Sequence, residues 1–268
     1  MTLEVLICSF NKGIVKVEDV LCEPRDGVRY IVSFQYTDER YLEMIPKSLT
    51  DRPDVRLFKY RGQGLSSNRN QALTHAKADI VMYADDDTRL KADTFDAITA
   101  IFEKHPDVDV ALFCASTYTG RLLKEYPTEE QDVASVPSDY HVSTVEMAFR
   151  RERIQGVVRY DERFGLGTRF LTCGEEDIWL FDVLKHDMKV RFFPECLVET
   201  SAMMKHTMIY VDAGVQRSFG AYLYYSRGHM AWLQCLRFAA RYTLRGYCHF
   251  VPTLRHLWQG AWYVRKTK

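Results

Sequence analysis

The first half of the chain alternates short apolar runs with segments of helical periodicity. The apolar runs have the length of strands and are rich in β-branched and aromatic residues; they cover 3–10, 29–34, 55–59, 80–84 and 108–113. Residues 66–76 start with helix-capping side chains, and residues 92–104 carry an apolar stripe that ends before Pro106. The alternation predicts an α/β sheet with crossover connections.

In such a sheet, ligands bind beyond the carboxyl ends of the strands. Several polar positions follow strands and are therefore expected on one rim, namely Ser9, Phe10, Asn11, Gln35 and Asp85-Asp86-Asp87. The second half is less regular. Residues 141–150 and 188–193 are expected to be strands, 175–186 a helix, and the chain after Val211 helical and basic.

The net charge of zero hides an asymmetry between the two ends of the chain. Residues 201–268 hold ten Lys or Arg and one acid, a balance of +9, which leaves −9 for residues 1–200. Arg237, Arg241 and Arg245 are four residues apart and share one helix face, with Trp232 and Leu236 nearby. This pattern suits an interfacial helix on anionic lipid. The alternative is a helix packed on the main domain with its arginines in solvent.

Composition narrows the class of protein further. The 268 residues and their 47% hydrophobic content are enough for one well-buried core. No run approaches the roughly 20 apolar residues of a membrane span, and the start of the chain does not resemble a signal peptide. The seven cysteines form no CxxC pair, so we expect a reducing, cytoplasmic location without disulfides or zinc.

The run Asp85-Asp86-Asp87 is the sharpest polar feature. Adjacent carboxylates repel one another, so three of them at the end of a buried strand favour a bound cation. Carboxylate oxygens suit Mg²⁺ or Mn²⁺, which often share ligands with substrate phosphates. In an extended strand Asp85 and Asp87 would face the ion from the same side. The alternative is that Asp87 and Thr88 cap the next helix and the other two acids are solvated.

Two further clusters lie at expected helix starts. Residues 64–70, Gly-Leu-Ser-Ser-Asn-Arg-Asn, form either an anion site or a plain capped helix. Glu176 and Asp177 fall in a first turn, where the helix dipole alone favours acids. Beside a metal site, such a carboxylate could instead take a proton from an acceptor hydroxyl. His206 is a candidate extra metal ligand, although the simpler interpretation is a surface histidine.

Five motifs follow one another in the chain: Phe10-Asn11, Gly64 with Arg69-Asn70, Ala76 and Asp79 before Asp85-Asp86-Asp87, the loop Phe164-Gly165-Leu166-Gly167, and Glu176-Asp177. In this order they resemble family 2 of the inverting glycosyltransferases, which have the GT-A fold. The resemblance covers residues 1–200. It implies a GT-A catalytic domain there, with a mixed, mainly parallel sheet flanked by helices, and a basic, aromatic, mainly helical extension over 201–268.

The resemblance also implies a role for each motif. Asp87 with Asp85 would hold Mn²⁺ or Mg²⁺ on the donor diphosphate, and Asp86 would lie near the ribose or donor sugar. The predicted nucleotide pocket is completed by Ser9, Phe10, Asn11, Gln35, Asn68 and Arg69. Asp177 would be the catalytic base, with Glu176 supporting it, in an inverting transfer to a hydroxyl of a glycan or lipid-linked saccharide, as in polysaccharide biosynthesis.

The second strand departs from the family pattern. An acidic Asp-Asp-Gly-Ser-like turn that reads the base is expected there, but residues 33–38 read Ser-Phe-Gln-Tyr-Thr-Asp, so Gln35 or Asp38 would substitute. UDP is the expected nucleotide because it is the commonest choice in the family.

Two other functions remain open on sequence alone. A nucleotidyltransferase that forms sugar nucleotides would share the acids, but only Gly13 stands where its glycine-rich loop should be. A non-enzymatic binding module would use the basic end and leave the acids unexplained. We expect the transferase, in the cytoplasm or peripheral on the inner membrane face, with no nucleic acid partner.

Overall fold

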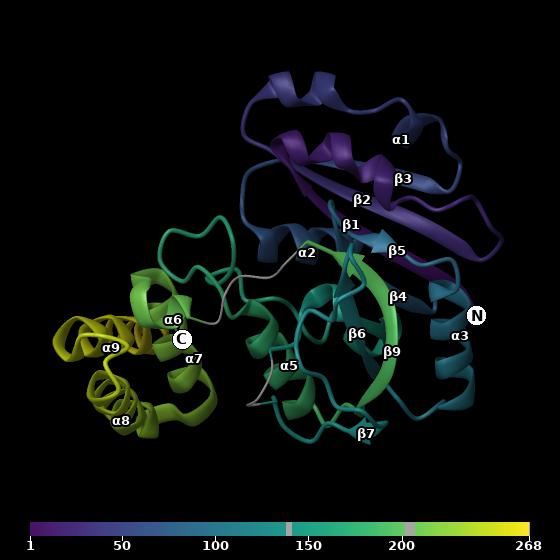
Figure 1. Ribbon diagram of the computed structural model, residues 1–268. Helices are drawn as coiled ribbons and strands as arrows, with labels where there is room; N and C mark the ends of the chain where they lie inside the picture. Colours follow the sequence, from purple (N-terminus) through teal and green to yellow (C-terminus); the bar gives the residue numbers. More distant parts are fainter. Residues whose placement is uncertain (138–140, 202–206, 268) are drawn as a thin grey trace. The chain divides into compact units, whose positions relative to one another are not determined.

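The computed structural model describes residues 1–137, 141–201 and 207–267 (Figure 1). Contacts within the chain form two compact units. The first unit comprises Met1–Gln63, Ser67–Tyr160 and Asp182–Ala202, and the second comprises Gly64–Ser66, Asp161–Phe181 and Met203–Lys268. This division follows contacts and leaves the predicted domain boundary at residue 200 a prediction.

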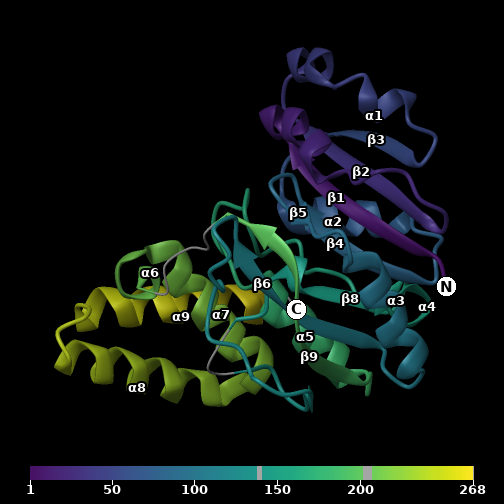
Figure 2. The same cartoon turned by 45° about the vertical axis from the view of Figure 1, so that its right-hand side comes forward.

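A mixed, mainly parallel sheet forms the first unit, as predicted (Figures 1 and 2). In the described residues its strands lie in the order β3 (Val55–Arg61), β2 (Val28–Tyr36), β1 (Leu3–Phe10), β4 (Ile80–Asp85), β8 (Met147–Arg150), β6 (Val110–Thr117), β9 (Val190–Thr200) and β5 (Arg89–Leu90), and β7 (Gln131–Asp132) pairs with β9. The pairs β3–β2, β2–β1, β1–β4 and β6–β9 are parallel. The short strand β8 runs antiparallel to both β4 and β6.

Helical segments cover the strands because their buried residues recur at helical spacing. In η1 (Asn11–Val20), Ile14, Val17 and Val20 are buried, and their spacing of three matches the 3₁₀ repeat. In α3 (Thr94–Lys104), Phe95 and Ile98 are among the residues that join the same hydrophobic core. The remaining short helices of this unit are η2 (Glu39–Met44), α1 (Ser48–Asp51), η3 (Thr144–Glu146) and α4 (Arg151–Ile154), and most of α2 (Leu65–Thr74) also belongs to it.

Two strand predictions differ from the structure. The strand expected over 141–150 is wrong for its first part, because η3 precedes β8: the buried Glu146 carboxylate accepts the Ser143 N–H at 2.9 Å and turns the chain. The strand expected over 188–193 extends to Thr200. The β6–β9 register shifts near Pro194, and this irregularity breaks the alternation that would reveal the second half of the strand.

The second unit is helical, which confirms the prediction for the C-terminal part of the chain. It holds the start of α5 (Glu175–Lys185), α6 (Met208–Val211), α7 (Ala213–Arg227), η4 (Gly228–Met230), α8 (Ala231–Leu244) and α9 (Phe250–Lys266). Its hydrophobic cluster joins Phe164, Leu171 and Ile178 to buried residues of α7, α8 and α9. In the described part of the chain, no helix combines the length and apolarity needed to cross a membrane.

Helices α7 and α9 cross at two glycines. A Cβ atom on Gly220 would lie 1.9 Å from the Leu257 carbonyl oxygen, and one on Gly260 would lie 1.8 Å from that of Arg217. These distances are far inside van der Waals contact, so only glycine lets the two backbones approach this closely.

We therefore expect Gly260→Ala to destabilise the second unit. Alanine favours a helix by about 1 kcal/mol over glycine, but the backbone clash should outweigh that gain and leave a net loss of about 1–3 kcal/mol. The four tryptophans, residues 179, 232, 258 and 262, all lie in this unit, so urea unfolding followed by tryptophan fluorescence reports on it selectively. Gln259→Ala, at the adjacent position on α9, is the control and should change the free energy of unfolding little. Equal stability of the two variants would contradict the close contact between α7 and α9 at Gly260.

Candidate active site

The carboxyl ends of β1, β2 and β4 form one edge of the sheet in the first unit. Phe10 pairs in register with Gln35, and Cys8 pairs with Asp85, so the residues that follow these strands are neighbours. Ser9 and Gln35 are buried, whereas Phe10 is 43% exposed. The predicted rim is thus present, with an aromatic ring open to solvent beside buried polar groups.

Asn11 joins the ends of β1 and β2. Its φ of 49° lies in the left-handed region, which asparagine tolerates better than most residues. The Thr37 backbone N–H donates to Asn11 Oδ1 at 2.9 Å, and Asn11 Nδ2 donates to Thr37 Oγ1 at 3.1 Å. These two bonds fix the backbone bend at which the chain leaves β1.

Asp86 packs against the start of η1. Ser9 Oγ donates to Asp86 Oδ2 at 3.1 Å, and a Cβ atom on Gly13 would lie 1.8 Å from that same oxygen. Gly13 is therefore required for the close approach of the carboxylate. Burial raises the pKa of Asp86, and the Ser9 hydroxyl opposes this by stabilising the charged form.

Arg69 supplies a buried positive charge on the same edge. Its guanidinium lies 3.7 Å from Asp85 Oδ1 and 5.2 Å from the centre of the Tyr160 ring. The Tyr83 hydroxyl donates to the Arg69 carbonyl at 3.1 Å, and Asn68 Nδ2 donates to the Ser9 carbonyl at 3.1 Å. The predicted helix start thus contributes both a cation and an amide to the rim.

Asp87 faces the end of β9. Ser201 Oγ donates to Asp87 Oδ2 at 2.6 Å, Thr200 Oγ1 lies 3.4 Å from Oδ1, and the Tyr118 hydroxyl donates to the Asp87 carbonyl. The predicted extended geometry is wrong here, because β4 ends at Asp85 and the Thr88 N–H closes a turn on the Asp85 carbonyl at 3.1 Å. Asp85 and Asp87 therefore contact different groups.

The oxygen-rich donor set suits a hard cation, although the side chains do not converge as they stand. In the described residues, no three His, Cys, Asp or Glu side chains are grouped as a metal site. Asp85, Asp86 and Asp87 are nevertheless adjacent and only half-buried, and the raised pKa of Asp86 reflects an anion without a nearby countercharge strong enough to offset its burial. Carboxylate and hydroxyl oxygens are the ligands that Mg²⁺ and Mn²⁺ prefer. His206 lies outside the described residues.

The second unit holds the other predicted motifs. Ser66 Oγ donates to the Phe164 carbonyl at 2.7 Å, and the Leu65 N–H donates to that of Leu166 at 2.9 Å. Gly165 has a φ of 103°, and a Cβ atom there would lie 3.0 Å from both the Glu175 carboxyl and Ser66 Oγ. The glycine loop thus lies directly against the start of α5.

Glu176 and Asp177 occupy the first turn of α5, as predicted. Both are half-buried, whereas their neighbour Glu175 is buried. Burial and then the charge of Asp177 raise the pKa of the Tyr222 phenol, which places that residue of α7 in the surroundings of the predicted base. These acids belong to the second unit, and the rim belongs to the first.

Several contacts on the rim were not predicted, among them those made by Gly13, Thr37, Tyr83, Tyr118, Tyr160, Thr200 and Ser201. The hydroxyls of Thr37 and Ser201 lie 26 and 114 residues along the chain from the side chains they bind, so no local pattern signals them. Gly13 is different, since a lone glycine after a strand that ends beside acids is a recognisable sign of close packing.

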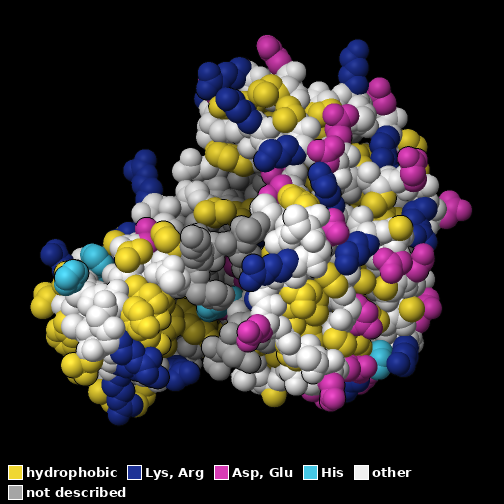
Figure 3. All heavy atoms as spheres, in the orientation of Figure 1, with side chains coloured by type: hydrophobic (Ala, Val, Ile, Leu, Met, Phe, Trp, Pro, Cys, Tyr) yellow, Lys and Arg dark blue, Asp and Glu magenta, His cyan; other side chains and the backbone are white. Residues whose placement is uncertain are grey.

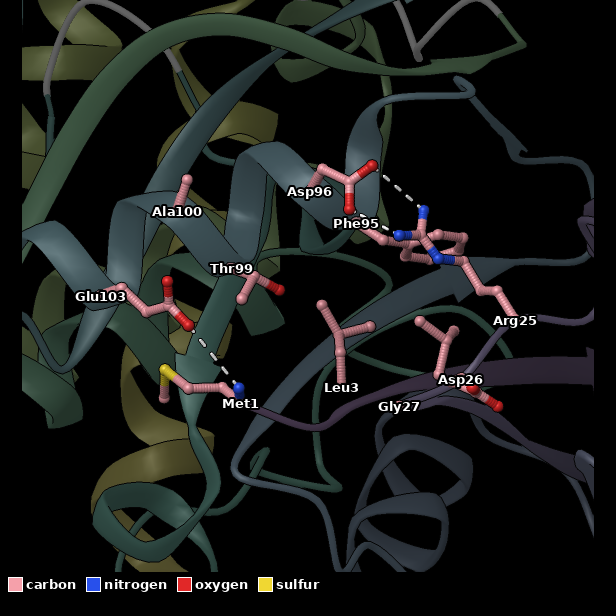
Figure 4. Close-up of a pocket in the computed structure, with 11 residues that line it drawn as sticks. Met1, Leu3, Arg25, Asp26, Gly27, Phe95, Asp96, Thr99, Ala100 and Glu103 are labelled. Atoms are coloured by element: carbon pink, nitrogen blue, oxygen red, sulfur yellow. Dashed lines mark hydrogen bonds and ion pairs between the residues drawn. The ribbon is translucent and has the colours of Figure 1, made fainter.

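A pocket of about 300 Å³ lies elsewhere in the first unit, at the amino ends of β1 and β2 beside α3 (Figure 4). Arg25 reaches Asp96 at 2.5 Å and covers the Phe95 ring, and the Met1 ammonium lies 3.7 Å from Glu103. Four of its charged groups are therefore already paired with one another. It is at the opposite ends of these strands from the rim and is a separate feature.

Comparisons with known proteins agree with this fold. The sequence model of glycosyl transferase family 2 matches residues 8–170. A crystal structure of S. aureus TarS 1-349 superposes with a TM-score of 0.61 at 12% identity, covering 100% of this chain and 92% of that one. S. aureus TarS gives 0.58 at 14%, covering 90% and 43%, and TarS 1-349 in complex with UDP-GlcNAc gives 0.54 at 14%, covering 91% and 73%. No curated protein sequence matches the chain.

The electrostatics of Asp86 predict a pH-dependent gain in stability for Asp86→Asn. The folded-state pKa of Asp86 lies above its unfolded value, so ionisation opposes folding, and stability falls as pH rises from the unfolded pKa through the folded one. The variant should therefore be more stable at pH 7, and the gain should vanish below about pH 4, where the carboxyl is neutral in both states.

Urea unfolding followed by far-UV circular dichroism measures this effect, since the first unit has no tryptophan. Asp19→Asn removes an exposed carboxylate from η1, the segment against which Asp86 packs, and is the control. A gain that persists unchanged at low pH would show that the substitution acts through packing rather than through charge.

Proposed function

The chain belongs to glycosyl transferase family 2 and is a glycosyltransferase of GT-A fold, and we propose that its donor is a UDP-sugar. The observation that carries the proposal is the edge formed by β1, β2 and β4, where Phe10, Arg69 and the three acids meet. The complex of S. aureus TarS 1-349 with UDP-GlcNAc supports the choice of nucleotide.

The donor site we propose consists of Ser9, Phe10, Asn11, Gln35, Asn68, Arg69, Asp85 and Asp86. The half-exposed Phe10 ring offers a stacking surface to a base. Asn11, bonded to Thr37, and the buried Gln35 would hold the strand ends that position this ring. Arg69 is buried, so its charge would act on a diphosphate with little screening by solvent.

Asp87 and Asp85 are the residues we propose to hold Mn²⁺ or Mg²⁺. A divalent ion at this place would neutralise the charge that develops on the nucleoside diphosphate as it leaves. Asp85 is already paired with the Arg69 guanidinium, and Asp87 with the Ser201 hydroxyl. Both carboxylates are thus held at the rim before a donor binds, which lowers the cost of ordering them.

We assign the role of catalytic base to Asp177, with Glu176 supporting it. A carboxylate removes the proton from an acceptor hydroxyl, whose oxygen then attacks the anomeric carbon opposite the leaving diphosphate and inverts its configuration. The first turn of α5 is rigid, because Ile178 and Trp179 are fully buried beside it. Asp177 itself is half-buried, so part of its side chain stays accessible to an acceptor.

The acceptor in this proposal is a hydroxyl of a glycan or a lipid-linked saccharide, and the reaction takes place in the cytoplasm at the inner membrane face. The seven cysteines are scattered along the sequence without a CxxC pair, a pattern that favours a reducing compartment. Growth of a polysaccharide or of its lipid-linked precursor is the process that such a reaction serves.

Donor binding is tested by a thermal-shift screen of nucleotide diphosphates with and without Mn²⁺. UDP at 100 times its Kd should stabilise by about 2.7 kcal/mol, which raises Tm by about 5–10 °C in a chain of this size. Mn²⁺ should enlarge the shift, and Asp87→Ala should abolish the enlargement. Asp19→Ala is the control and should respond to Mn²⁺ as the unmodified chain does. A thermal shift with UDP that is the same with and without Mn²⁺ would refute the metal assignment.

The base is tested by Asp177→Asn, with release of UDP from a panel of UDP-sugars as the measurement. The rate should fall about 10²–10⁴-fold, because the amide cannot accept the proton, whereas the thermal shift with UDP should remain. Asp187→Asn, an exposed position just after α5, should keep its full rate. Undiminished UDP release by Asp177→Asn would assign the base elsewhere, and pyrophosphate release from UTP plus sugar phosphate would indicate a nucleotidyltransferase.

A further inference from the structure

Helices α8 and α9 expose an unusual number of apolar side chains. Of the sixteen large hydrophobic residues that are exposed in the described part of the chain, eight lie between Met230 and Trp262. They are not needed for packing, since α8 already buries Ala231, Cys235 and Ala239 and α9 buries Leu257, Ala261 and Val264. The outward faces of both helices are therefore apolar beyond what the fold of the unit requires.

The exposed faces of the two helices form one continuous surface. The Trp232 ring of α8 lies 6.2 Å from the Trp258 ring and 6.3 Å from the Trp262 ring of α9, measured between ring centres. Figures 1 and 2 both show α8 and α9 running side by side. Trp258 and Trp262 are still 42% and 45% exposed, so the cluster is open on its outer side.

The turn between α8 and α9 is the most exposed apolar part of this surface. Leu244 at the end of α8 is 89% exposed, Val251 at the start of α9 is 72% exposed, and Tyr247 between them is 55% exposed. Side chains of this size gain from leaving water. The Tyr210 ring stacks on one side of Tyr247, at 5.1 Å between ring centres, whereas Leu244 and Val251 stay largely open among the described residues.

The same surface is strongly basic. Residues 213–268 contain nine Lys or Arg and no Asp or Glu. Arg237, Arg241, Arg245 and Arg255 are exposed, and within the described chain none of these four forms an ion pair with a carboxylate. Figure 3 shows Lys and Arg side chains next to hydrophobic ones over α8 and α9. Arg265 and Lys266 lie over the Trp262 ring at 4.9 and 5.2 Å.

We propose that the outer face of α8 and α9 docks on an anionic phospholipid bilayer, with the turn at Leu244, Tyr247 and Val251 inserted into the interface. Arginines along the helices would contact lipid phosphates while their stems cover the acyl boundary. Trp258 and Trp262 would lie at the headgroup level, where indole rings are preferred. This inference rests on the proposed location at the inner membrane face and names the surface that docks there, but it does not depend on the donor or the reaction.

A soluble polyanion is the main rival occupant, and the apolar turn argues against it. A polyphosphate or nucleic acid chain would satisfy the arginines, but it offers little to leucine and valine side chains that are 89% and 72% exposed. A bilayer satisfies both at once, because it combines phosphate groups with an apolar layer directly beneath them.

The test is binding of the full chain to vesicles of phosphatidylcholine alone and of phosphatidylcholine mixed with phosphatidylglycerol. We expect binding to the anionic vesicles and little to the neutral ones, with a blue shift of tryptophan emission as Trp258 and Trp262 leave water. The variant R237Q/R241Q/R245Q should lower the partition coefficient about tenfold or more. The variant L244S/V251S should lower it several-fold while all the charges remain.

Matched controls come from the first unit. K47Q/K59Q/K104Q removes the same number of exposed positive charges, and L122S/V157S removes two apolar side chains that are 47% and 48% exposed. Both controls should bind anionic vesicles as the unmodified chain does. Substitution on the chain surface is preferable to deletion of 201–268, which would remove most of the hydrophobic cluster around Ile178.

Three results would overturn the proposal: equal binding to neutral and anionic vesicles, equal losses in the control variants, or full vesicle binding by L244S/V251S together with displacement by polyphosphate. The last would identify a polyanion site instead. UDP release measured on the same variants without vesicles should be unchanged. Loss of UDP release in every variant and the unmodified chain would count against the proposed reaction and leave the docking result intact.

Discussion

Backbone hydrogen bonding of β1 to parallel strands on both sides determines where the polar groups of the rim lie. With β2 in register on one side and β4 on the other, Phe10, Gln35 and Asp85, which lie at or next to the ends of their strands, fall at the same edge of the sheet. A slip of one residue would move the buried side chains of a strand to its other face. Because Val5, Leu6 and Ile7 are all fully buried, apolar packing along β1 holds the register on which the position of the acids depends.

The acids on this edge are spread over separate partners. Asp85 faces the buried Arg69, Asp86 faces the Ser9 hydroxyl, and Asp87 faces Ser201 at the end of β9. This arrangement reduces the repulsion that three adjacent carboxylates would otherwise suffer. Among the described residues, Arg69 is the buried cation on this acidic rim. A diphosphate would add more negative charge than Arg69 alone offsets, and this is the physical reason for proposing a second cation there.

The sequence predicted the strands of the first half well, because parallel strands buried on both faces leave continuous apolar runs. It missed η1, whose spacing of three residues fits neither the strand nor the α-helix period. Pro194 concealed the second half of β9, and the buried Glu146 produced a turn where a strand was expected. The rim was predictable from strand ends, whereas Thr37 and Ser201 were not, because they approach the site only through tertiary folding.

The close crossing of Gly220 and Gly260 has a consequence for the order in which the protein matures. The second unit gathers three separate stretches of chain, and its hydrophobic cluster joins Phe164 and Ile178 to residues as late as Val264. During synthesis, segments 64–66 and 161–181 therefore cannot complete their packing until α9 has been made. The acidic turn that contains Asp177 completes its packing only then, whereas every strand of the first unit is already present once residue 200 has been synthesised.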